Sequence, residues 1–198
     1  MEILTLGILK HAAALPSGNP LTAKDLLHLG NRAAVDQALS RLVRRGTLVR
    51  VGRGIYMRPI ESRFGMRPPA ASDVVEAIGV QRGETIARHG AAAANAFGLT
   101  TQVPVREIYL TSGRNRRLQF GAQVVELRHA PAWQLILPGR LAGDAVRALA
   151  WLGPKRAGAA LRAMERKLPP AELAAVLAAR GRLPTWMARE VSAFANNG

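Results

Sequence analysis

The chain has 198 residues, enough for one large domain or two small ones whose cores need neither metal nor disulfides. Lysine and arginine number 28 against 13 aspartates and glutamates, which gives a net charge of +15 at pH 7. An excess of this size favours a polyanionic partner, and nucleic acid is the first to consider. There is no cysteine, which excludes disulfide frameworks, cysteine-bound zinc, iron–sulfur clusters and thiol catalysis.

The short apolar run at residues 3–9 does not have the features of a signal peptide. Glu2 precedes it without any basic residue, and Lys10 and His11 interrupt the segment that should stay apolar. We therefore expect an amphipathic helix over 2–14 and a cytoplasmic protein. No stretch approaches the roughly 18 uninterrupted apolar residues of a membrane span, so we expect no membrane partner.

Two more helices and a hairpin are expected next. Thr22 and Asp25 have the spacing of a capping box, which predicts a second helix over about 22–29. Asn31 at the start of 31–45 can cap a third helix, which a glycine ends. The run 47–59 alternates apolar residues around Gly-Arg-Gly and predicts two short strands joined by a glycine-containing turn.

A composition change at 63–71, which is rich in proline and glycine, predicts a linker. We therefore expect a DNA-binding domain at 1–66 and a mixed α+β domain at 67–198. Residues 1–68 carry a charge of +7 and residues 69–198 carry +8, so charge is about twice as dense in the shorter part. The second domain should contain helices at 73–79, capped by Ser72, and 90–97, strands within 105–113 and 116–130 with a turn at Gly121–Ala122, and helices at 141–151, 155–167, 170–180 and 185–195.

A helical wheel separates the third helix into two faces. At 100° per residue, one apolar stripe collects Val35, Ala38, Leu39 and Leu42. The opposite side collects Gln37, Ser40, Arg41 and Arg44, whose side chains can hydrogen-bond to base edges and phosphates. Three helices followed by a hairpin are the layout of a winged helix-turn-helix, in which the third helix reads the major groove.

The expected DNA-binding set combines this helix with the hairpin. Gly52 and Gly54 leave Arg53 at a tip that can enter a minor groove or follow the phosphates. A charged helix face is also commonly a solvated surface, and this reading stands beside the DNA-binding one. The full set is Asn31, Arg32, Gln37, Ser40, Arg41, Arg44 and Arg45 on the helix, and Arg50, Arg53 and Arg58 on the hairpin.

Three segments carry a resemblance to a known family. Residues 31–56 resemble the N-terminal winged helix of AbiEi-type antitoxins, and 86–100 with 105–113 resemble the second domain of that family. The resemblance implies a type IV toxin–antitoxin pair with a nucleotidyltransferase-like toxin. It further implies that the first domain represses the operon at inverted repeats and that the second domain supplies the antitoxin activity.

The second domain also contains candidate sites, with fewer residues pointing to one function than in the first domain. The loop 111–117 offers a phosphate or nucleic-acid contact through Ser112, Arg114, Arg116 and Arg117, or is simply an exposed approach to a hairpin. His89 and Asn95 lie near a helix start, where local capping is commoner than a ligand role. The three tryptophans are expected in the helical core, and base stacking would require them to be exposed.

Enzyme signatures are absent from the sequence. It contains no Gly-x-Ser-x-Gly elbow, no phosphate-binding GxxxxGK[ST] loop and no paired carboxylates after a glycine–serine turn. The four histidines do not have the spacing of a metal site, so we expect no bound metal. Because the enzyme motifs are missing as well, we expect neither catalysis nor a cofactor. Two alternatives to DNA recognition remain: a protein interaction module whose charge reflects biased codon usage, and an RNA-binding regulator.

Overall fold

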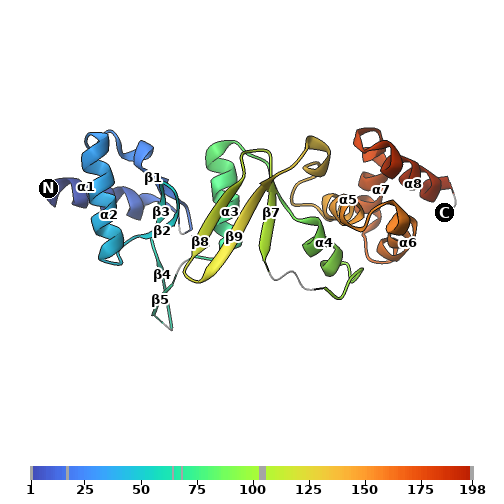
Figure 1. Cartoon of the computed structure of the whole chain (residues 1–198), viewed down its shortest axis with the longest axis horizontal. Coiled ribbons are helices and arrows are strands. Elements are labelled where there is room, and N and C mark those ends of the chain that lie inside the picture. Colours follow the sequence, from blue (N-terminus) through green and yellow to red (C-terminus); the bar gives the residue numbers. More distant parts are fainter. Residues whose placement is uncertain (1, 17, 64, 68, 103–105, 197–198) are drawn as a thin grey trace. The chain divides into compact units, whose positions relative to one another are not determined.

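The computed structural model describes all residues except 1, 17, 64, 68, 103–105 and 197–198, and Figure 1 labels its elements in chain order. The chain is a mixed α+β protein with small antiparallel sheets and a helical C-terminal region, as expected at this level. Its contacts divide it into two compact units, 1–84 with 117–125, and 85–116 with 126–198. The expected boundary between domains 1–66 and 67–198 is a statement about which parts fold independently, and it stays a prediction.

The first unit is built from short elements around one apolar cluster. The sheet order β1-β3-β2 is antiparallel throughout, and Leu21 of β1 lies opposite Tyr56 of β3. Buried residues between Ile8 and Tyr56 form the core of this part. The elements are α1 (Glu2–Ala14), β1 (Leu21–Thr22), the 3-10 helix η1 (Ala23–Leu26), α2 (Arg32–Arg44), β2 (Val49–Gly52), β3 (Ile55–Met57), β4 (Ile60–Ser62), β5 (Gly65–Arg67) and α3 (Ala71–Arg82).

The positions of the first helix, the third helix and the β2–β3 hairpin are confirmed, whereas the second helix is wrong as an α-helix. The first helix is not amphipathic as expected, because Ile3 and Leu6 are 86% and 68% exposed. Thr22 pairs with Ile55 in β1, so the chain is still extended where the helix was expected to begin. The capping contact itself exists, because Asp25 accepts hydrogen bonds from the Thr22 backbone N–H at 2.8 Å and hydroxyl at 2.9 Å. It starts only a four-residue 3-10 helix, whose buried residues Ala23 and Leu26 have the three-residue spacing of that helix.

The linker expected at 63–71 is also wrong in part. Ile60 pairs with Arg67 in the β4–β5 hairpin, and Gly65 has the positive φ of 95° that its turn requires. Helix α3 starts at Ala71 and is longer than the expected 73–79. Ser72 is therefore not its cap; its hydroxyl lies 3.1 Å from Asp73 within the first turn. Residues 64 and 68 of the expected linker lie outside the described residues.

The remaining elements begin with β6, which was not expected, because three residues carry too little periodicity to reveal a strand. The sheet order is β6-β7-β9-β8, and β6 pairs antiparallel with β7. The helix at 90–97, the three strand runs and the four C-terminal helices are confirmed; Val105 lies outside the described residues. The elements are β6 (Ile86–Arg88), α4 (Gly90–Ala96), β7 (Glu107–Thr111), β8 (Arg116–Phe120), β9 (Gln123–His129), η2 (Ala132–Gln134), α5 (Leu141–Leu152), α6 (Pro154–Glu165), α7 (Pro170–Ala178), η3 (Ala179–Arg182) and α8 (Thr185–Asn196).

Close packing of α4 on α5 holds the C-terminal region together. A Cβ added at Gly90 would lie 2.3 Å from the Arg147 carbonyl oxygen, so only glycine lets the two helices approach this closely. The Arg147 side chain is 1% exposed. Its guanidinium donates to the carbonyls of Gln134 and Ile136 and to the Asp144 carboxylate at 2.9–3.2 Å. Three polar contacts thus offset part of the cost of burying this charge, while the Arg147 Nε has no hydrogen-bond partner among the described residues.

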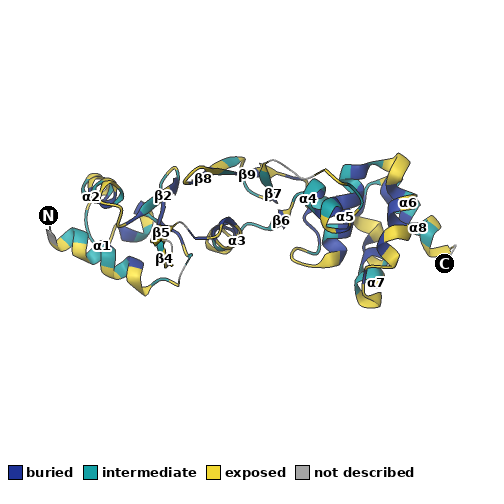
Figure 2. Cartoon of the chain, turned by 90° about the horizontal axis from the view of Figure 1, so that it is seen from below, coloured by how far each residue is buried: buried dark blue, intermediate teal, exposed yellow. Residues whose placement is uncertain are grey.

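Helix α5 is buried along almost its whole length, whereas α6 and α8 each have a buried side and an exposed side, and Figure 2 colours the helices by this burial. The tryptophans Trp133, Trp151 and Trp186 are half-buried against the helical core, close to the expectation. None of the helices in the described part of the chain combines the length and apolar character needed to cross a membrane.

Candidate nucleic-acid interface

Helix α2 has defined ends that fix which side chains share a face. The Asn31 side-chain oxygen accepts the Ala34 N–H at 2.9 Å, which is the expected N-cap. At the other end Gly46 follows the C-cap residue Arg45 with φ of 71°, a conformation that favours glycine. The helix therefore begins and ends where the sequence predicts.

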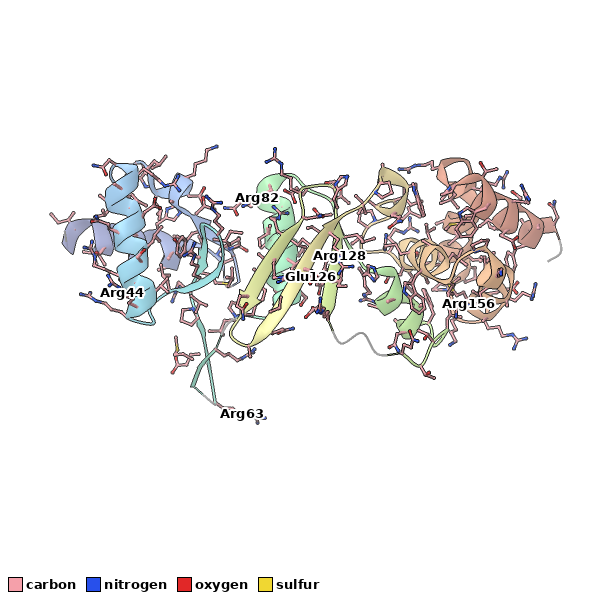
Figure 3. All side chains as sticks on the ribbon, viewed as in Figure 1. Arg44, Arg63, Arg82, Glu126, Arg128 and Arg156 are labelled. Atoms are coloured by element: carbon pink, nitrogen blue, oxygen red, sulfur yellow. The ribbon has the colours of Figure 1, made fainter. Side chains whose placement is uncertain are left out.

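The two faces of α2 differ as the helical wheel predicts. The apolar stripe is buried, with Val35, Ala38 and Leu39 at 0% exposure and Leu42 at 1%. On the other side Gln37, Ser40 and Arg44 are exposed and Arg41 is half-exposed. Together with Asp36 these four line a shallow depression along the helix. Figure 3 shows Arg44 at the C-terminal end of α2, directed away from the body of its unit.

Ser40 and Arg32 of the expected set both contact Asp36 of α2. The Ser40 hydroxyl donates to the Asp36 carbonyl at 2.8 Å, which leaves its oxygen free to accept. Arg32 pairs with the Asp36 carboxylate at 2.8 Å, and its side chain is still 64% exposed. An exposed pair of this kind stabilises the protein by about 1 kcal/mol at most, so Arg32 can exchange it for a phosphate at little cost.

The hairpin presents arginines from β2 and its turn. Arg50 and Arg53 are exposed, and Gly54 has the φ of 70° that allows the tight turn beside Arg53. The register shifts between Arg50 and Gly52, so the hairpin carries a bulge just before its tip. The Arg50 Nε donates to the Gly52 carbonyl at 3.3 Å, which leaves the terminal guanidinium nitrogens of Arg50 for other partners.

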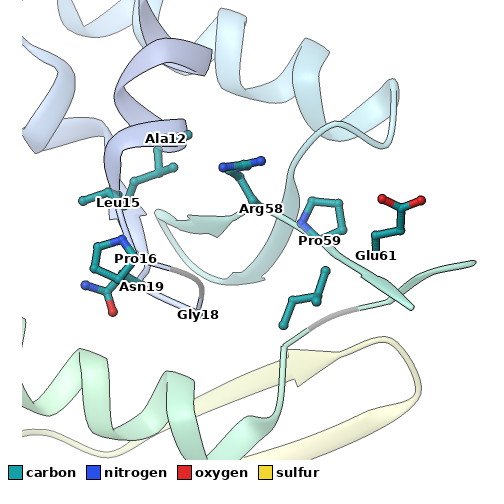
Figure 4. A pocket seen from close by; sticks show the side chains of 10 residues that line it. Ala12, Leu15, Pro16, Gly18, Asn19, Arg58, Pro59 and Glu61 are labelled. Atoms are coloured by element: carbon teal, nitrogen blue, oxygen red, sulfur yellow. The ribbon is translucent and has the colours of Figure 1, made fainter. Parts of the chain in front are cut away.

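Arg58 lies apart from the depression on α2. It lines a separate hollow of about 220 Å³ at the C-terminal end of α1, together with Leu15, Pro16 and Glu61. Figure 4 shows this hollow with Arg58 between the end of α1 and the strand that follows β3. The structure thus brings Gln37, Ser40, Arg41 and Arg44 together and places Arg58 in different surroundings.

The loop 111–117 is braced by internal hydrogen bonds. The Thr111 hydroxyl, which is fully buried, accepts the Gly113 N–H, and the Ser112 hydroxyl accepts the Thr85 N–H at 2.9 Å. The Asn115 oxygen accepts the His129 N–H at 2.6 Å. Ser112 therefore has a structural partner, which weakens its case as a phosphate ligand. Of the arginines in the expected set, Arg114 and Arg117 are exposed and Arg116 is half-buried.

His89 and Asn95 have local structural roles. The His89 Nδ1 caps α4 by accepting the Ala91 N–H at 3.2 Å, and burial followed by repulsion from Arg128 lowers the pKa of His89. Asn95 donates to the carbonyls of Thr100 and Gln102. Across the described residues, no group of three or more histidines or carboxylates gathers as a metal site would require.

The sequence also matches a family model. Residues 7–167 match DUF6088, which is described as a family of unknown function. The chain belongs to this family. No curated protein and no solved structure matches it. Within this DUF6088 protein the matched stretch contains α2, the β2–β3 hairpin and the loop 111–117, and the family description assigns none of them a role. The resemblance to AbiEi-type antitoxins therefore stays a prediction.

One feature of the site region could not be found in the sequence. A second groove of about 590 Å³ lies between the end of α1 and α3, and two of its residues are Glu76 and Val80. In the sequence Val80 is one of several apolar residues of α3, with Val74, Val75 and Ile78, and nothing local marks it as exposed. Its exposure depends on how α3 packs, which local periodicity does not determine.

Proposed function

We propose that this DUF6088 protein is a sequence-specific binder of double-stranded DNA that uses residues 1–66 as a winged helix-turn-helix. Helix α2 would enter the major groove, and the β2–β3 hairpin would follow the adjacent backbone. The observation that carries the proposal is the division of α2 into a fully buried apolar stripe and an opposite face bearing Gln37, Ser40, Arg41 and Arg44.

Each group on this face has a matching target in a DNA groove. Arg41 and Arg44 can donate two hydrogen bonds to guanine O6 and N7, and Gln37 can bond to adenine N6 and N7. Ser40 retains acceptor capacity, which suits a base amino group. Arg53 at the hairpin tip supplies a phosphate or minor-groove contact. The proposal thus separates two base-reading arginines from a backbone-binding one.

Duplex DNA fits this surface better than the two alternatives do. The deep, narrow major groove of A-form RNA does not admit a helix, so α2 could not read it in this way. A protein interaction module would be expected to present apolar anchors among its charges. The exposed side of α2 has none, because the four residues that line its depression with Asp36 are all polar.

Salt-dependent binding tests this function. Fluorescence anisotropy would compare the full chain on its own upstream DNA and on a scrambled duplex between 50 and 200 mM salt, a range that alters phosphate contacts strongly. We expect preference for the upstream DNA and a log–log salt slope on the order of −4 to −6, from about six cations. Arg162→Ala, which removes an exposed arginine of α6, is the control that should leave the preference unchanged. A slope near zero without preference would favour the interaction module.

The biological setting that we propose is the one implied by the resemblance of 31–56, 86–100 and 105–113 to AbiEi-type antitoxins. The protein would repress its own operon and neutralise a nucleotidyltransferase-like toxin encoded beside it. Co-expression with the neighbouring gene tests this part separately from DNA binding. Growth arrest by the neighbour that this chain relieves would support it, and a neighbour without toxicity would contradict it while the DNA-binding proposal stands.

A further inference from the structure

A groove of about 590 Å³ lies between the C-terminal end of α1 and the exposed side of α3. Its volume falls within the range of about 300–1,000 Å³ that is typical of ligand sites. Leu15 and Pro20 supply apolar wall on one side, and Val80 of α3 supplies it on the other. Val80 is 81% exposed and is the large apolar residue that α3 contributes to the lining of the groove.

The charge of this groove is opposite to that of the chain. Among its described lining residues are two carboxylates, Asp73 and Glu76, and no lysine, arginine or histidine. The chain as a whole has a net charge of +15. At physiological salt the Debye length is about 8 Å, so groups in the groove respond mainly to nearby charges, which are these carboxylates and Arg58 of the neighbouring hollow that shares Leu15 with the groove. The two carboxylates on the groove's own wall therefore favour a cation there.

The carboxylates are available for a partner. Within the described part of the chain, the Glu76 carboxylate has no hydrogen bond or ion pair, and the Asp73 carboxylate contacts only the adjacent Ser72 hydroxyl at 3.1 Å. Glu76 and Val80 are four residues apart on α3 and so lie on one face, one helical turn from each other. A negative group thus lies next to an exposed apolar one along the groove.

We propose that this groove is a docking site for a basic amphipathic segment of a partner protein. An apolar side chain of the segment would cover Val80 and Leu15, while a lysine or arginine beside it would pair with Asp73 or Glu76. Charge complementarity selects this occupant, because DNA is repelled by the same carboxylates. The inference does not depend on DNA binding by α2.

A labelled peptide can test this docking on the full chain. The probe is a fluorescein-labelled amphipathic helix of leucine and lysine, and its counterpart carries glutamate at every lysine position. Anisotropy at 150 mM salt should show saturable binding of the lysine peptide only. Glu76→Lys should weaken this binding at least tenfold, and Val80→Ser about fivefold. Glu165→Lys changes an exposed carboxylate of α6 by the same charge and should alter affinity less than twofold.

Several results would overturn the proposal. Equal losses for Glu76→Lys and Glu165→Lys would show that the peptide responds only to net charge, and equal binding of the glutamate peptide would remove the role of the carboxylates. A concentration-dependent dimer in sedimentation that Val80→Ser dissociates would make a second copy the occupant.

Two controls belong to these variants. Because the side chains of Glu76 and Val80 are both exposed, the melting temperatures of Glu76→Lys and Val80→Ser should stay near that of the wild type. The DNA affinity of Val80→Ser should also be unchanged, which separates this site from the α2 face.

Discussion

At the scale of single residues, the account depends on which side chains of α2 meet a base. Arg41 is half-exposed in the depression on α2, so Arg41→Ala should weaken binding to the preferred DNA by about 1–3 kcal/mol and relax base choice at one position. Arg53 lies at the hairpin turn, so Arg53→Ala should weaken binding to all DNA sequences by a similar factor. It should also make the log–log salt slope shallower by about one. Titration of preferred and scrambled duplexes distinguishes the two. Unchanged affinity in both variants would show that the docking geometry is wrong.

His89 makes folding stability depend on pH. Burial, with a smaller contribution from Arg128, lowers its pKa below the ordinary value of 6.5. The folded state therefore binds the proton less readily than the unfolded chain does. The resulting stability is present above pH 6.5 and is lost as pH falls through the lowered pKa of the folded state. Neutral Nδ1 is also the form that accepts the Ala91 N–H.

Chemical denaturation between pH 7.5 and 5 checks this prediction. His89→Asn keeps a side chain that can cap the helix and should remove much of the decline in the free energy of unfolding. His28→Asn alters an exposed histidine and should leave the decline in place. A decline that is identical in wild type and His89→Asn would assign the pH dependence to other groups.

At the scale of elements, glycine at position 90 permits the packing of α4 on α5. An added Cβ would lie 2.3 Å from the Arg147 carbonyl oxygen and 2.8 Å from the Trp151 Cβ, so a helix backbone must move. Gly90→Ala should lower the free energy of unfolding by roughly 1–3 kcal/mol, measured by denaturant titration. Gly181→Ala is the matched control, because nothing lies within 4 Å of its Cβ position. Equal stability of both variants would contradict the packing.

The elements also show how far the sequence predicts this fold. Helix α2 was predictable because Asn31, an apolar stripe and Gly46 all act locally and agree. The strands β1 and β6 were not, because each has two or three residues and is defined by pairing with distant partners such as Tyr56. Because Thr22 is extended in β1, only the short 3-10 helix η1 forms where the second helix was expected. The exposed face of α2 was predictable from periodicity, whereas the α1–α3 groove depends on how Val80 emerges from tertiary packing.

At the scale of the whole molecule, the account assigns DNA binding and antitoxin activity to different parts of the chain. The apolar cluster that supports α2 draws its buried residues from Ile8 to Tyr56, all of them within 1–66. We expect residues 1–66 alone to bind the upstream DNA with wild-type preference and to leave a toxic neighbouring gene product active. Anisotropy and co-expression growth assays check the two halves. Growth rescued by residues 1–66 alone would contradict the assignment of antitoxin activity to the second domain.

The central claim is that the exposed face of α2 reads base pairs. Selection of bound duplexes from a random library, followed by sequencing, measures this directly for the full chain and for Gln37→Ala. We predict that the wild-type chain enriches one motif and that Gln37→Ala loses preference at a single A·T position while keeping the rest. Enrichment of no motif, or an identical motif from both proteins, would contradict the claim.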